Sequence, residues 1–309
     1  MTTFARLLLR RVALLIVLLA AVFVAVDLLP GNTARAVLGR EATPEQVAAK
    51  ERELGLDRPI AVRFVDWISG VATGDFGRTA RGRSINELLA DKFPPTLLLG
   101  GLALAVTVLA SVLLGAWWAT RSRGAAARVL QPGTTVAAAV PEFVLATLLI
   151  MVLSLATGWL PAVAIAGRSG FPVSADMLVL PVLALAIPQI GWNTRVVRAA
   201  LADAARAPHV ETAVLDGLST PHVLARYLVP FAAPTIVASF ATTVGLLLGG
   251  ALVVETIFNY PGLGAVLAGS VADRDTSVVA AVVALSGMVI MLMLAVADGI
   301  RAWSLRGRR

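Results

Sequence analysis

Long apolar runs recur along the chain and alternate with polar links. Runs of about 20 residues, the length of helix that crosses the hydrocarbon core of a bilayer, lie at 9–29, 96–119, 134–157, 177–197, 232–254 and 277–300. The later runs exclude a single signal anchor on a soluble domain. The first run is too long for a cleavable signal peptide, and no small-x-small cleavage site follows it. The pattern predicts an all-α integral membrane protein with six transmembrane helices.

The composition agrees with an integral membrane protein and excludes several kinds of catalytic and binding site. Of 309 residues, 58% are hydrophobic and 15% are charged, whereas about a quarter of a soluble domain is charged. Cysteine is absent, which excludes disulfides, thiolate metal sites and cysteine nucleophiles. Neither Lys50 nor Lys92, the two lysines, precedes Ser or Thr, so the chain lacks a P-loop for ATP. We expect no catalytic residue, no bound cofactor and no metal site.

Arginines predict the orientation. They gather before the first span, after the second, between the fourth and fifth and after the last, at Arg6, Arg10, Arg11, Arg121, Arg123, Arg128, Arg195, Arg198, Arg206, Arg226, Arg301, Arg306, Arg308 and Arg309. The short links on the other side hold only Arg168 and Arg274. The positive-inside rule therefore places both termini in the cytoplasm. The net charge of +7 is then explained by arginines in the predicted cytoplasmic segments, and we expect no nucleic-acid partner.

The segment 31–95 is long and nearly charge-balanced, and such loops translocate largely regardless of charge. We predict a folded external loop. Thr43–Gln46 (TPEQ) reads as a capping box, and Gly55 is suited to ending the helix that it starts. Apolar residues then recur at helical spacing, at Ile60, Phe64, Trp67, Ile68 and Val71. This amphipathic helix either packs against the outer face of the protein or contacts an external partner.

A polar segment from Ala207 to Pro230 separates the fourth and fifth apolar runs. Pro208 suits a first helical turn, and one face of the helix carries Val210, Ala213, Val214, Gly217 and Leu218. Gly217 can end that helix. Thr220 and Pro221 predict the start of a second helix, and Pro230 marks the boundary between this helix and the fifth span. The segment is either a pair of short cytoplasmic helices with a mechanical role or an interfacial linker.

These residues resemble a known family. The stretch ETAVLDGL with the later LVP is similar to the EAA loop of ABC importer permeases, matching it at Glu211, Ala213, Gly217 and Pro230. The resemblance implies that these residues, with Thr212 and Leu218 beside them, couple the chain to an ATPase. DLLPGN, ELGLDRPIAVRFVDWI, GDFGRT, WLPA and ETIFNYPGLG occur in the order typical of the dipeptide/oligopeptide branch. Two positions depart from the family pattern: Asp216 stands where a basic residue is common, and Asn32 where Asp is.

The resemblance implies a function and a set of partners. The pair of helices would transmit motion from a cytoplasmic ATPase, which binds ATP and Mg²⁺ on its own chain. A second permease subunit would complete the pore, and an external binding protein would deliver substrate. The location would be the prokaryotic inner membrane. The expected parts are an N-terminal tail and first span (1–30), the external loop (31–95) and a five-helix core (96–309) that includes the coupling loop 200–230.

Polar residues inside the spans are candidates for the translocation path, because exposing them to lipid is costly. Glu142 would lie about 12 Å into the third span, where interfacial snorkelling or a tie between subunits is the alternative. Asn193 lies in the fourth span, and Thr242 and Thr243 in the fifth. The threonines can instead bond to carbonyls of their own helix.

Two other classes remain as alternatives. Half of a secondary transporter would have paired broken helices near the midplane and a coupling-ion carboxylate, for which Glu142 is the only candidate. A membrane-embedded zinc protease would need HExxH, a pattern that neither His209 nor His222 completes. The substrate stays open: peptides are the default for this branch, and nickel complexes and glutathione pass through relatives.

Overall fold

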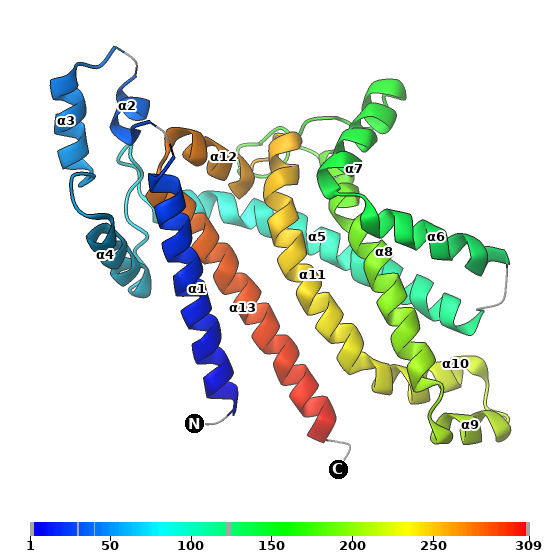
Figure 1. Ribbon diagram of the computed structural model, residues 1–309. Coiled ribbons are helices and arrows are strands. Elements are labelled where there is room, and N and C mark those ends of the chain that lie inside the picture. The colour runs from blue at the N-terminus through cyan, green and yellow to red at the C-terminus, as the bar shows by residue number, and fades with distance from the viewer. Residues whose placement is uncertain (1–2, 30, 40, 122–124, 307–309) are drawn as a thin grey trace. The chain divides into compact units, whose positions relative to one another are not determined.

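The computed structural model describes residues 3–29, 31–39, 41–121 and 125–306, which are mainly helical (Figure 1). The shorter helices at the start are α2 (Thr33–Leu38), α3 (Pro44–Glu53) and α4 (Ile60–Ala72). The other helices are α1 (Thr3–Asp27), α5 (Ile85–Thr120), α6 (Ala125–Ala139), α7 (Glu142–Leu149), η1 (Ile150–Ala156), η2 (Ala175–Leu178), α8 (Val179–Ala204), α9 (Pro208–Leu215), α10 (Thr220–Val223), η3 (Leu224–Leu228), α11 (Val229–Ile257), α12 (Leu263–Asp273) and α13 (Thr276–Arg306). Pro30 of the DLLPGN motif, Arg123, Arg308 and Arg309 lie outside the described residues.

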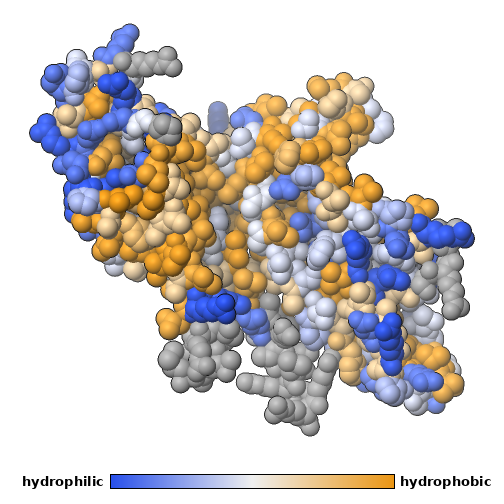
Figure 2. Space-filling view, viewed as in Figure 1, coloured by the Kyte–Doolittle hydropathy of each residue, from blue (hydrophilic) through white to orange (hydrophobic). Residues whose placement is uncertain are grey.

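Five helical segments among the described residues are long and apolar enough to cross a membrane: Leu9–Asp27, Ile85–Thr120, Ala175–Ala204, Thr220–Ile257 and Thr276–Val296. They correspond to the first, second, fourth, fifth and sixth apolar runs. The second extends further than the sequence predicted, because α5 begins at Ile85 and continues through Pro94 and Pro95. Figure 2 shows hydrophilic residues gathered over α2 and α3, whereas the surface over α1 is mainly hydrophobic.

The third predicted span, 134–157, is not one straight helix. The chain forms the helical pair Ala127–Ala139 and Glu142–Ala156, bent by 104°. Proline accounts for the break: Pro141 has no amide hydrogen to continue the helix, and its ring disfavours helical backbone at Val140. The pair counts as a sixth candidate span only if both arms belong to one crossing.

The chain divides into two compact units, each described here by itself. The first unit comprises residues 1–95 and 261–291. In it, α4 packs its apolar face on α1: Phe23 of α1 lies 5.6 Å from Phe64 and 5.9 Å from Trp67, measured between ring centroids. Arg63 of α4 forms an ion pair of 2.8 Å with Asp27 of α1. The amphipathic helix expected from the sequence therefore covers α1.

The caps predicted in this unit are confirmed. Thr43 and Gln46 exchange the two hydrogen bonds of a capping box at α3, and Gly55 follows that helix with a φ of 65°. Asn32 caps α2 by accepting from the Arg35 amide at 3.0 Å, and its own Nδ2 donates to Glu51. The aspartate common at this position in the family cannot donate, and it would face the Glu51 carboxylate. The departure at Asn32 therefore has a local physical reason.

The turn between α12 and α13 contacts the loop 31–95. Asp275 Oδ2 accepts a hydrogen bond of 2.5 Å from the amide of Ala80. The backbone carbonyl of Arg274 accepts one of 3.1 Å from Thr33, and Asp273 pairs with Arg81 at 2.8 Å. Thus the loop packs on a turn almost 200 residues away in sequence. The loop and residues 261–291 belong to the same compact unit.

The second unit comprises residues 96–260 and 292–309. Its central helix is α8, which packs against α11, α6 and α7 (Figure 1). Glycine permits the closest approach: a β-carbon at Gly191 of α8 would lie 2.7 Å from Thr134 O and Ala138 N of α6. Packing at this distance leaves α6 and α8 in backbone contact.

Candidate functional site

Helix α9 occupies the centre of the polar segment between α8 and α11. It begins with Pro208 in its first turn and carries Glu211 near its N-terminus, where a carboxylate interacts favourably with the helix dipole. Gly217 follows the helix with a φ of 76°, and the amide of Leu218 donates to the carbonyl of Ala213 at 3.2 Å. This is the left-handed glycine turn predicted from the sequence.

One face of α9 is anchored to the long helices. Val210 and Ala213 are buried in a cluster with Val197 and Leu201 of α8, Val223 of α10, Leu228 of η3 and Ala232 of α11. The ring of His209 lies 4.4 Å from that of Phe231 on α11, measured between centroids. Helix α9 is therefore packed into the cluster that also contains side chains of both long helices.

The opposite face of α9 and the turn after it are exposed, and several of these side chains are apolar. Val214 is 58% exposed and Leu215 is 80% exposed, with Leu218 in the turn. Glu211, Thr212 and Asp216 are exposed beside them. Of the predicted apolar face, only Val210 and Ala213 turn inward. Leu215 was not among the predicted site residues. The signal in the sequence was a pair of apolar residues, Val214 and Leu215, followed three residues later by Leu218.

The second predicted helix of this segment is not a separate element. Ser219, rather than Thr220, is the residue before α10, and the helical chain then continues through the π-helical turn η3 into α11, from Thr220 to Ile257. Pro230 lies in the first turn of α11 without interrupting it. A proline cannot donate an amide hydrogen bond to the preceding turn, and the regular α-helical hydrogen bonding is replaced by π-helical bonding in that turn, η3.

Two of the predicted path residues bind each other. Asn193 of α8 is fully buried, and its Nδ2 donates to Thr243 Oγ1 of α11 at 2.8 Å. Its Oδ1 accepts from Ser239 at 2.7 Å. Thr242 instead is exposed and donates to the carbonyl of Ala238 in its own helix at 3.1 Å. The geometry gives Asn193 and Thr243 a role in joining α8 to α11, and a role in the path stays a prediction.

We expect Thr243→Val to weaken the packing of α8 on α11. The change keeps the side-chain volume but removes the acceptor for Asn193, which costs about 1 kcal/mol, or somewhat less for bonds between membrane helices. The measurement is thermal unfolding of the detergent-solubilised protein. Thr242→Val is the matched control and should leave the midpoint unchanged; equal shifts for both variants would contradict the assignment.

Glu142, the fourth predicted path residue, is the first residue of α7 and lies at the 104° bend. The depth of about 12 Å expected for a straight span does not apply, because the helix is broken there. Its Oε1 lies 3.1 Å from the position that a β-carbon on Gly250 of α11 would occupy. The carboxylate therefore sits against the backbone of α11.

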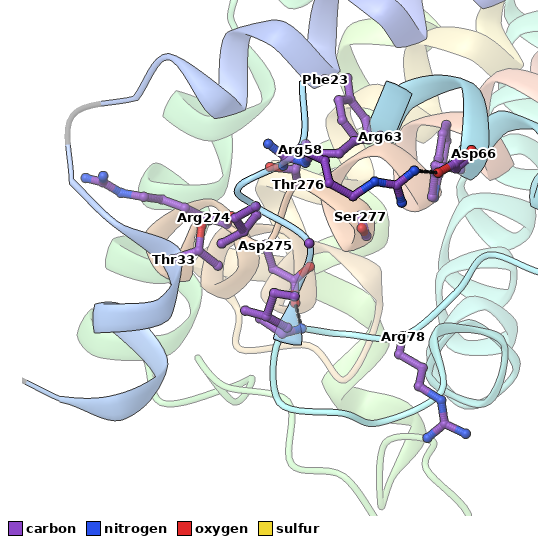
Figure 3. A pocket seen from close by; sticks show the side chains of 15 residues that line it. Phe23, Thr33, Arg58, Arg63, Asp66, Arg78, Arg274, Asp275, Thr276 and Ser277 are labelled. Atoms are coloured by element: carbon purple, nitrogen blue, oxygen red, sulfur yellow. Dashed lines mark hydrogen bonds and ion pairs between the residues drawn. The ribbon is translucent and has the colours of Figure 1, made fainter. Parts of the chain in front are cut away.

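A cavity of about 200 Å³ lies in the first unit (Figure 3). Several arginines line it, and the sequence analysis did not predict that they lie near one another. Its lining includes Arg58, Arg63, Arg78, Arg274, Asp66 and Asp275. Arg58 pairs with Asp66 at 2.8 Å, and burial raises the pKa of Asp275. Within the described ranges, no group of three or more His, Asp or Glu residues is placed to hold a metal ion.

Comparison with known proteins gives the family. A family model described as "Binding-protein-dependent transport system inner membrane component" matches residues 111–309, and a second, for the N-terminal part of such components, matches residues 2–84. The "Probable peptide ABC transporter permease protein y4tP" of Sinorhizobium fredii is 30% identical over 278 residues, which cover 89% of each chain. The "Glutathione transport system permease protein GsiC" of Salmonella choleraesuis is 32% identical over 288 residues, covering 92% of this chain and 91% of the relative.

A solved structure shares the fold. It is described as "Crystal structure of an amino acid ABC transporter with histidines", superposes with a TM-score of 0.53 at 19% identity, and covers 67% of this chain and 89% of its own. The helical architecture, the apolar spans and the two family matches agree with one another. The protein belongs to the family of binding-protein-dependent transport system inner membrane components and is a permease of an ABC importer.

Proposed function

We propose that this permease moves peptides or small peptide-like solutes inward, driven by an ATPase subunit that docks on α9. The exposed apolar surface of Val214, Leu215 and Leu218 carries this proposal. It lies on an element anchored to both α8 and α11, and apolar side chains on a short polar segment are typical of a protein–protein contact. Docking at this surface would pull on both helices together.

The remaining partners follow from the family. A second permease subunit completes the pore, and an external binding protein delivers substrate to the side that carries the loop 31–95. The ATPase holds ATP and Mg²⁺, and this chain contributes mechanics rather than catalysis. Arginine distribution supports cytoplasmic termini in the inner membrane. The substrate class is supported by the relatives, one named for peptide and one for glutathione transport.

Copurification and topology test this function. We expect the tagged permease to bring down an ATPase and a second permease, and the operon's binding protein to carry a peptide identifiable by mass spectrometry. Because the chain has no cysteine, single cysteines at the exposed positions Thr73 and Ser219 report orientation directly. Thr73→Cys should react with an impermeant thiol reagent in intact cells, and Ser219→Cys only after permeabilisation. The reverse labelling, or a permease purified without an ATPase, would refute the proposal.

A further inference from the structure

Glu142 is the only carboxylate between Ala127 and Ala156, the two arms of the bent pair. It is partly buried and follows the break at Pro141. Helix α7 packs against both α8 and α11. The carboxylate therefore lies where three apolar helices meet, and a charge in such surroundings needs water or a compensating cation.

Gly250 creates the space for this carboxylate. A β-carbon there would lie 3.1 Å from Glu142 Oε1 and 3.2 Å from Leu185 Cδ2 of α8, tighter than ordinary contacts. The neighbouring Gly249 has nothing within 4 Å of its β-carbon position. Only one of the two adjacent glycines thus shapes the surroundings of Glu142.

Glu142 has no counterion among the described residues. The ion pairs of the described chain involve other carboxylates, and the structure gives Glu142 no hydrogen-bond partner. The Asn193 side chain on α8 is engaged elsewhere, with Gln189 O, Thr243 and Ser239, whereas Gln189 Oε1 and Thr194 Oγ1 on the same helix are buried without a hydrogen-bond partner. Neither of these two groups carries a positive charge, so water or a cation from outside the described chain completes the surroundings of the carboxylate.

We propose that Glu142 binds the ammonium group of the transported solute, so that the permease selects molecules with a free primary amine. This inference rests on the proposed function and assigns its specificity. A primary ammonium is compact, carries three donors and forms short charge-assisted hydrogen bonds with a carboxylate. An ammonium is a compact point charge, whereas a guanidinium is a broader planar group, so the ammonium needs less space beside a carboxylate that lies against α11. Gly250 acts as a positioning residue, because it lets the carboxylate lie against α11.

The direct test traps the contact chemically. The purified complex of permeases and ATPase is incubated with trialanine amide and a water-soluble carbodiimide. The carbodiimide activates a carboxylate, the peptide amine attacks it to form an amide, and the urea leaves with the elements of water. We expect mass spectrometry to find trialanine amide on Glu142 at concentrations that leave the exposed Asp57 unmodified, with at least about tenfold selectivity, the scale of one charged hydrogen bond. Glu142 modified no more than Asp57 would overturn the proposal.

Variants and uptake complete the test. In vesicles with saturating binding protein that carries trialanine, Glu142→Gln should lower uptake about tenfold or more, on the same scale, with subunit composition unchanged. Gly250→Ala should lower uptake and the Glu142 adduct by a smaller factor, and Gly249→Ala should match the unmodified protein. Loss of the second permease from the Glu142→Gln complex would instead identify a tie between subunits. Normal transport by the unmodified complex with unchanged Glu142→Gln uptake would refute this inference and leave the proposed function standing.

Discussion

Gly217→Val is expected to abolish most ATP-driven uptake while the spans stay inserted. Gly217 has a φ of 76°, a conformation that a β-branched residue adopts only at a cost of roughly 1–3 kcal/mol. No atom lies within 4 Å of its β-carbon position, so the effect is one of backbone conformation rather than of collision. The turn would relax and displace Leu218 relative to α9. Uptake and binding-protein-stimulated ATP hydrolysis, measured in the same vesicles, report the loss of coupling.

Two further variants separate docking from turn geometry. Gly217→Asn should retain most activity, because asparagine tolerates the left-handed conformation. Leu215→Glu should reduce ATPase copurification without lowering the thermal midpoint, because the side chain is 80% exposed and contributes little to the fold. Should Gly217→Val and Leu215→Glu both transport normally, the segment would be a linker and the docking proposal would fail.

Gly191→Val is expected to cause the largest loss of stability in the second unit. Its β-carbon would lie 2.7 Å from backbone atoms of Thr134 and Ala138, and backbone cannot move aside as a flexible side chain can. Overpacking of this kind costs typically 1–3 kcal/mol and sometimes more. Helix α6 would have to move away from α8. Thermal unfolding in detergent, followed by the amount of monodisperse protein, measures the effect.

Gly133 provides the matched control for this prediction. It belongs to α6 itself, and nothing lies within 4 Å of its β-carbon position. Gly133→Val should therefore change the unfolding midpoint far less than Gly191→Val, despite the same substitution in the same helix pair. Equal destabilisation by the two variants would mean that intrinsic helix propensity, rather than the α6–α8 contact, controls stability here.

Features that depend on neighbouring residues were determined by the sequence. Apolar runs of bilayer length located five long helices, because length and hydropathy alone decide whether a helix can cross a membrane. The capping box at Thr43–Gln46 and the left-handed turn at Gly217 followed from local hydrogen bonding and backbone sterics. The EAA-type residues between Ala207 and Pro230, together with the other short motifs along the chain, indicated the family, since each motif lies within one short segment.

Only the tertiary structure decided the features that join distant segments. Hydropathy averages over a window, so it read 134–157 as one span although Pro141 bends it by 104°. The pairing of Asn193 with Thr243 depends on how α8 packs on α11, and the contact of the loop 31–95 with Asp275 joins residues 195 positions apart. Side-chain direction also needed the fold, because the same α9 buries Val210 and exposes Leu215. Periodicity gives the faces of a helix, but which face is covered depends on the other helices that pack against it.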